Sequence, residues 1–81
     1  MKQNDLFIVF KETFPTAKFD TSFNTLELNS IPEWDSLGNL NLILRIEEVF
    51  AIRFSSMELS ELKSIKQIEQ ALKSKGVYDD Q

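Results

Sequence analysis

The chain contains no cysteine and no histidine among its 81 residues. Without cysteine it can form neither a disulfide framework nor a thiolate zinc site, and it has no cysteine nucleophile. Without histidine it lacks the commonest general base and the commonest metal ligand. These two absences exclude most of the ways in which a small enzyme or a metal-binding domain is built.

Long apolar runs are also missing. The longest run, Leu6-Phe7-Ile8-Val9-Phe10, is far too short to cross a membrane. No signal-peptide core follows the first residues, so we expect a cytoplasmic protein without a membrane span. The net charge of −4 argues against a nucleic-acid partner, because nucleic-acid binders normally carry the opposite sign.

The composition is that of one small globular domain. Hydrophobic residues make up 42% and charged residues 27%, a typical soluble mixture. A chain of this length buries only ~60% of its unfolded surface, which leaves room for one core and little space for a deep catalytic cleft. We therefore expect a single domain over residues 1–81, with its core at about 4–75 and a frayed tail at 76–81.

Apolar residues recur at helical rather than strand spacing. The pattern predicts helices over about 4–14, 35–50, 55–62 and 64–75. A first loop of about twenty residues, with a short helical turn in it, is expected to lie across the core, held there by its apolar side chains. The sequence therefore predicts an all-α fold, a small four-helix bundle of three main helices, one short helix and a long first loop. The predicted core positions are Leu6, Phe10, Leu42, Ile46, Phe50, Ile65, Ile68 and Leu72.

Polar residues mark where these helices begin. Asn4 or Asp5 is predicted to cap the first helix, and Asp35 the second. Two later serines, Ser55 and Ser64, are followed three residues on by Glu58 and Gln67, which is the spacing of a capping box.

The helix predicted at 35–50 has two apolar faces instead of one. Its core face carries Leu42, Ile43, Ile46, Val49 and Phe50. A second stripe of Leu37, Leu40 and Leu44 lies between about 40° and 100° on the helical wheel when Ser36 is placed at zero. Either the long first loop folds over this stripe, or the stripe is an exposed docking face.

Ser36 lies at the start of this helix. As a nucleophile it would need a base within hydrogen-bond reach, and the one nearby candidate, Asp35, is better used as a cap. A serine that another enzyme modifies needs no base of its own, only exposure, and helix N–H groups favour an attached phosphate. Glu47, Glu48, Glu58 and Glu61 are interpreted as a solvated face, because no calcium-loop pattern is present and no metal site is predicted.

These residues resemble the acyl carrier protein family. The resemblance begins at Trp34-Asp35-Ser36-Leu37-Gly38 and continues through Ile46-Glu47-Glu48-Val49-Phe50-Ala51-Ile52-Arg53-Phe54 to a short acidic helix and a last amphipathic helix. It covers about residues 4–75 and is densest from Trp34 to Leu72.

The resemblance implies a carrier that is not itself an enzyme. Ser36 would be esterified with 4'-phosphopantetheine, taken from coenzyme A by a phosphopantetheinyl transferase that reads Asp35 and Leu37. The thiol of that arm would carry an acyl or aminoacyl group as a thioester, so that a chain without cysteine could still handle thioesters. Acyl-loading enzymes and acyl-transfer or condensing enzymes would be the further partners of a monomeric carrier.

The expected partner face combines leucines with charged residues. Its members are Leu40, Asn41, Leu44, Arg45, Glu47, Glu48 and Glu58. Arg45 would weaken attraction to a basic docking surface and favour an acidic or neutral one. The alternative is a solvated Arg45 that pairs with Glu48 or hydrogen-bonds Asn41.

Several positions depart from family members of primary fatty acid synthesis. Gly38, Asn41 and Val49 stand where acids are common, and Asn39 stands where related carriers often have histidine. The string resembles stand-alone carriers of specialised pathways such as polyketide, peptide or surface-polysaccharide acylation.

Two other functions stay open at this point. One is a helical adaptor of the same fold without the arm, against which the intact Asp35-Ser36-Leu37 argues. The other is a small serine hydrolase that uses Ser36, against which the lack of histidine argues.

Overall fold

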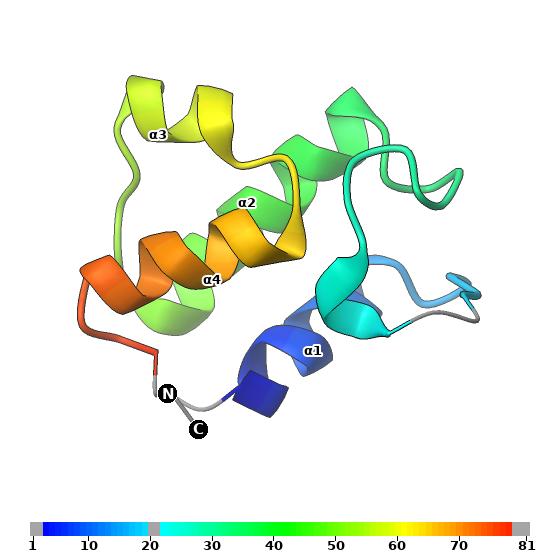
Figure 1. Cartoon of the computed structure of the whole chain (residues 1–81), viewed down its shortest axis with the longest axis horizontal. Helices are drawn as coiled ribbons and strands as arrows, with labels where there is room; N and C mark the ends of the chain where they lie inside the picture. The colour runs from blue at the N-terminus through cyan, green and yellow to red at the C-terminus, as the bar shows by residue number, and fades with distance from the viewer. Residues whose placement is uncertain (1–2, 20–21, 79–81) are drawn as a thin grey trace.

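The computed structural model describes residues 3–19 and 22–78, and this part of the chain is all-α (Figure 1). Its elements are α1 (Gln3–Thr13), the 3-10 turn η1 (Phe23–Thr25), α2 (Ser36–Phe50), α3 (Ser56–Glu61) and α4 (Ile65–Ser74). The described residues contain no strand beyond one isolated antiparallel bridge between Glu27 and Ser64. The predicted fold class, three main helices plus one short helix and a long first loop, is confirmed.

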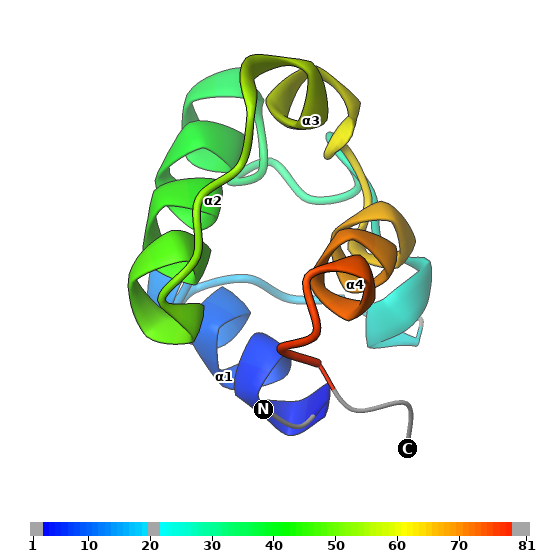
Figure 2. The same cartoon turned by 90° about the vertical axis from the view of Figure 1, so that its left-hand side faces the viewer.

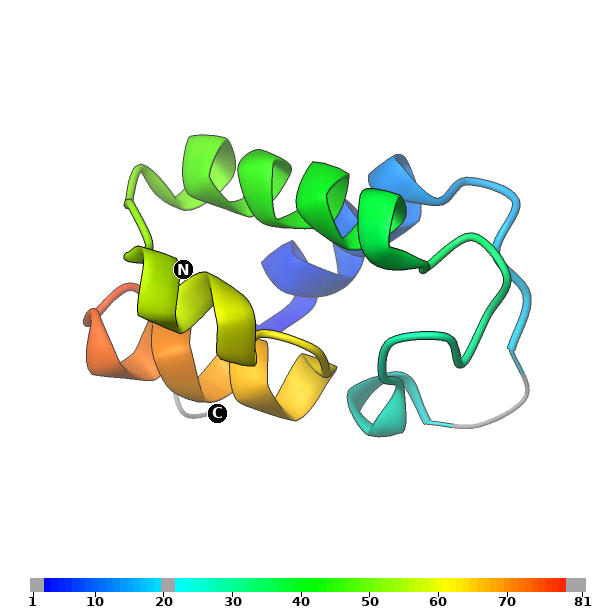
Figure 3. The same cartoon turned by 90° about the horizontal axis from the view of Figure 1, so that it is seen from above.

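The four helices surround a common centre, as Figure 2 shows. α1 packs against α2, and α4 lies beside η1 on the other side of the molecule. Seen from above, the short α3 lies beside α2 and covers part of α4 (Figure 3). None of the described helices combines the length and the apolarity that a membrane crossing requires.

Aromatic rings fill the centre beside the predicted aliphatic side chains. All eight predicted core residues are at most 3% exposed. Phe10 meets the rings of Phe14, Phe19, Phe23 and Trp34 edge-on, at centroid distances of 5.1 to 6.2 Å. Trp34, which the sequence places in a loop, is completely buried.

The long first loop runs toward the junction of α3 and α4, away from the outer face of α2. The Leu28 N–H donates to the Lys63 carbonyl at 2.7 Å, and the Ile65 N–H donates to the Leu26 carbonyl at 3.0 Å. The predicted helical turn is η1, and Leu26, Ile31 and Trp34 are the buried anchors. The loop therefore leaves the leucine stripe of α2 uncovered.

Two predicted helix starts are corrected. α1 begins at Gln3, so Asn4 and Asp5 lie inside its first turn and are not its cap. At α4 the Ser64 hydroxyl accepts from the Gln67 N–H at 3.1 Å as predicted, but the Gln67 side chain accepts from the Lys63 N–H, one residue before the cap. The box at Ser55 and Glu58 is complete.

The tail is more ordered than predicted. Gly76 has the left-handed φ of 76° expected of a residue after a helix end. Tyr78 is buried, with its ring 6.3 Å from that of Phe50 and its hydroxyl 3.2 Å from a Glu69 oxygen. Burial of this aromatic side chain holds residues 76–78 against the helices, so the fraying predicted for them is not found. Residues 79–81 lie outside the described residues.

Candidate functional site

The start of α2 presents Ser36 to solvent. Asp35 is the N-cap, as predicted: its backbone is extended, and its Oδ1 accepts from the Gly38 N–H at 2.8 Å. Ser36 is the first helical residue and is exposed. Within the described residues its hydroxyl has no hydrogen-bond partner, and the carboxylate of the preceding Asp35 caps the helix.

Gly38 is buried behind this turn at a point of close backbone approach. A Cβ at this position would collide with the Glu33 carbonyl oxygen and lie 3.1 Å from the Phe14 ring. In the sequence, Gly38 was noted only because related carriers of primary fatty acid synthesis often have an acidic residue there. The structure gives the reason for it, because the loop that precedes Ser36 passes directly over the first turn of α2.

Asn39 links three segments around the site. Its Oδ1 accepts from the Trp34 indole N–H at 2.9 Å, and its Nδ2 donates to the Leu62 carbonyl at 3.0 Å. Sequence reasoning missed this bridge. The available signal was Trp34 itself, because an indole N–H that is buried usually finds an acceptor.

The leucine stripe of α2 is an exposed face. Leu37, Leu40 and Leu44 are 68%, 49% and 51% exposed. Of the two readings left open by the sequence, burial under the first loop is wrong. Met57 and Leu59 of α3 are also exposed apolar residues, and the sequence did not single them out.

The four carboxylates interpreted from the sequence as a solvated face differ in their surroundings, and only two of them are exposed. Glu48 and Glu61 are exposed. Glu47 is half-buried, and its carboxylate accepts from the Phe54 N–H at 2.8 Å. Glu58 accepts from the Ser55 N–H at 2.7 Å and pairs with Lys75 at 3.2 Å.

These contacts change the chemistry of Glu58. The Ser55 N–H, opposed by some desolvation and aided by the Lys75 ammonium, holds the pKa of the Glu58 carboxyl below its usual value. Among the described residues, no three acidic side chains come together as a metal site would require.

Arg45 pairs with a different helix than expected. Its guanidinium lies 3.0 Å from the Glu12 carboxylate of α1, with both side chains about half exposed. The alternative given above, in which Arg45 pairs with Glu48 or Asn41 of its own helix, is therefore wrong. Part of the positive charge that was assigned to partner selection is neutralised by α1.

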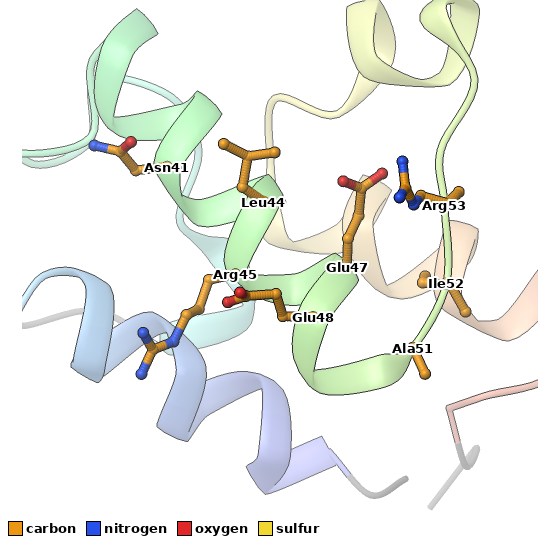
Figure 4. Close-up of a pocket in the computed structure, with 8 residues that line it drawn as sticks. All are labelled: Asn41, Leu44, Arg45, Glu47, Glu48, Ala51, Ile52 and Arg53. Carbon is orange, nitrogen blue, oxygen red and sulfur yellow. The ribbon is translucent and has the colours of Figure 1, made fainter.

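Five of the predicted partner residues line one open hollow. The hollow measures about 760 Å³ and lies between the outer face of α2 and the connector after it (Figure 4). Its lining residues are Asn41, Leu44, Arg45, Glu47, Glu48, Ala51, Ile52 and Arg53. Leu40 and Glu58 are outside this lining, and Ser36 lies at the far end of the same helix.

Comparison with known proteins adds no relative. No family model matches the chain, and neither a curated protein nor a solved structure is significantly similar to it.

Proposed function

We propose that this chain is an acyl carrier protein of the specialised-pathway type. Ser36 would carry 4'-phosphopantetheine as a phosphodiester, and the thiol of the arm would carry an acyl or aminoacyl group. The observation that carries this proposal is the exposed Ser36 at the first residue of α2, beside an exposed leucine face.

The surroundings of Ser36 favour a modified serine over a nucleophilic one. Asp35 uses its carboxylate to cap α2 at 2.8 Å from the Gly38 nitrogen, and the chain has no histidine to act as base. An enzyme that modifies Ser36 brings its own base and needs only access. The free N–H groups of the first turn of α2 stabilise the phosphate of an attached arm.

The leucine face supports partner docking. Three leucines, each at least 49% exposed, form an apolar strip along one helix, and such strips on small proteins commonly mark interaction sites. Leu37, one residue from Ser36, would be read by the transferase together with Asp35. Leu40 and Leu44, with Glu48, would contact the enzymes that load or unload the arm.

The test is the intact mass after incubation with coenzyme A, Mg²⁺ and a broad-range phosphopantetheinyl transferase. We expect one phosphopantetheine per chain. Ser36→Ala should abolish the addition and leave the far-UV circular dichroism spectrum unchanged.

A matched control is Ser56→Ala. Ser56 is also exposed and is also the first residue of a helix that follows a capping residue, yet it lacks the leucine face. It should be dispensable for modification. Modification of the Ser36→Ala variant would contradict the proposal.

A further inference from the structure

The short helix α3 has no fully buried residue of its own. None of Ser56–Glu61 is buried, and Met57 is 76% exposed. Burial comes instead from the residues at its two flanks, Phe54 and Leu62. A helix of six residues is far too short to be stable by itself, so its place is set by what holds those flanks.

Two side chains of α2 hold the two flanks of α3. The Glu47 carboxylate accepts from the Phe54 N–H at 2.8 Å, just before α3 begins. The Asn39 side chain donates to the Leu62 carbonyl at 3.0 Å, where α3 ends. The Leu62 carbonyl, at the C-cap of α3, is one of the groups that a helix leaves without an intrahelical partner. The Phe54 N–H belongs to the connector, one residue before the capping Ser55.

We call these two hydrogen bonds, Glu47 to Phe54 and Asn39 to Leu62, the clamps of α3. Their spacing matches the length of α3. Asn39 and Glu47 are separated by roughly 12 Å along α2, and α3 with its capping residues is also roughly 12 Å long. The early residue of α2 holds the end of α3, and the later residue holds its start, so the two helices run in opposite directions. From the other side, Lys75, the C-cap residue of α4, pairs with Glu58 at 3.2 Å.

α3 therefore has a fixed place close to Ser36. Asn39 is about one helical turn from Ser36, so the Leu62 end of α3 lies next to the proposed modification site. A partner of ordinary size covers about 800 Å² on each protein, whereas the whole chain measures 29 × 28 × 18 Å. We therefore expect an enzyme that acts on Ser36 to contact both α2 and the neighbouring end of α3.

We propose that Asn39 and Glu47 are positioning residues, which fix α3 against α2 so that an enzyme acting on Ser36 meets one rigid surface made of both helices. The inference rests on the proposed function. It gives a role to Asn39, which the sequence analysis noted only because related carriers often have histidine there. It also replaces the earlier assignment of Glu47 as a charged residue that contacts partners.

The test compares variants that break one clamp with variants that make the same charge change without breaking it. Asn39→Asp can still accept from the Trp34 indole but cannot donate to Leu62, and its control is Asn24→Asp, at an exposed asparagine of η1. Glu47→Ala removes the acceptor for Phe54, whereas Glu47→Gln removes the same charge and keeps an acceptor oxygen.

Two readouts are needed, and the first is amide hydrogen exchange by NMR. The loss of one hydrogen bond should speed exchange in α3 about 5-fold or more. We expect this in Asn39→Asp and Glu47→Ala, with exchange in α1 and α4 unchanged. Glu47→Gln and Asn24→Asp should exchange like the wild type.

The second readout is the kinetics of phosphopantetheine transfer to Ser36. In both clamp variants the KM for the carrier should rise about 3-fold or more while kcat stays within about 2-fold, the pattern of lost binding without lost chemistry. Unchanged exchange in α3, or freer exchange with an unchanged KM, would overturn the inference. A wild-type chain that the transferase does not modify would instead overturn the proposed function.

Discussion

Gly38 shows how much one residue contributes to the presentation of Ser36. Alanine is normally preferred over glycine inside a helix by about 1 kcal/mol, so a sequence-based design would replace it. Here the position is buried, and the Glu33 carbonyl and the Phe14 ring occupy the space that a Cβ needs. The steric conflict outweighs the helix preference because backbone, rather than a flexible side chain, would have to move.

Gly38→Ala is therefore expected to destabilise the fold by about 1–3 kcal/mol, the range of overpacked sites. Denaturant unfolding monitored by circular dichroism measures the change. Asn41→Ala, at an exposed position of the same helix, should stay within about 0.5 kcal/mol. A stabilised Gly38→Ala variant would show that the loop before Ser36 does not pass over α2 as described.

Side-chain contacts could be predicted from the sequence where the two partners are close along the chain. The cap of Asp35 on Gly38 and the box of Ser55 and Glu58 span three residues each, and local spacing is sufficient to find them. Arg45 pairs with a residue 33 positions away, and Asn39 with one 23 positions away. No local pattern reports such partners, because they depend on how the helices pack.

α2 divides its apolar residues between two environments. Ile46 is completely buried, whereas Leu44, two residues earlier, is 51% exposed. Ile46→Ala should cost about 2–5 kcal/mol, since it removes buried methyl groups and leaves a cavity. Leu44→Ala should cost about 0.5 kcal/mol or less, and equal losses in the two variants' free energies of unfolding would contradict the orientation of α2.

The start of α3 should respond to pH through Glu58. Its carboxyl pKa is lowered in the folded chain by the Ser55 N–H first and by Lys75. A carboxyl with a lowered folded pKa stabilises the fold above its unfolded pKa, about 4.3, and this contribution is lost as the pH falls through the folded pKa.

Glu58→Gln should therefore weaken the loss of stability between neutral pH and about pH 3. The measurement is the free energy of unfolding at several pH values. Glu61→Gln, at an exposed position of the same helix, is the control for removing one negative charge. If the two variants show the same pH dependence, the Glu58 contacts contribute nothing particular.

At the scale of the whole molecule, the described tail residues pack against α2 and α4 through Tyr78. The sequence analysis did not predict this contact. The helices, their order and the predicted core could be read from apolar spacing, because that spacing reports which face each helix buries. The tail has no such period: a single tyrosine after a glycine carries the contact, and its partners Phe50 and Glu69 lie on other elements. The path of the first loop could not be predicted either, because it is fixed by pairing with residues 63–65, far along the chain.

Tyr78 should make the fold sensitive to alkaline pH. Burial first, and then the Glu69 carboxylate, raise the pKa of the Tyr78 phenol above its ordinary value. A phenol with a raised folded pKa stabilises the fold below its unfolded pKa, about 10, and this contribution is lost as the pH rises further. The chain contains one tyrosine, so phenolate absorbance reports Tyr78 alone.

We expect phenolate to form only well above the pH at which the unfolded chain ionises, and we expect stability to fall over the same range. Tyr78→Phe keeps the ring against Phe50 and should lose less stability above about pH 10. A phenol that titrates like that of the unfolded chain would show that the tail is not packed.

The most direct test of the carrier proposal is to locate the modification. After incubation with coenzyme A, Mg²⁺ and a broad-range transferase, the protein is digested with trypsin, and the peptide of residues 19–45 is fragmented in a mass spectrometer. This peptide holds three serines, Ser22, Ser30 and Ser36. We expect one phosphopantetheine, on Ser36. An unmodified peptide, or an arm on either of the other serines, would contradict it.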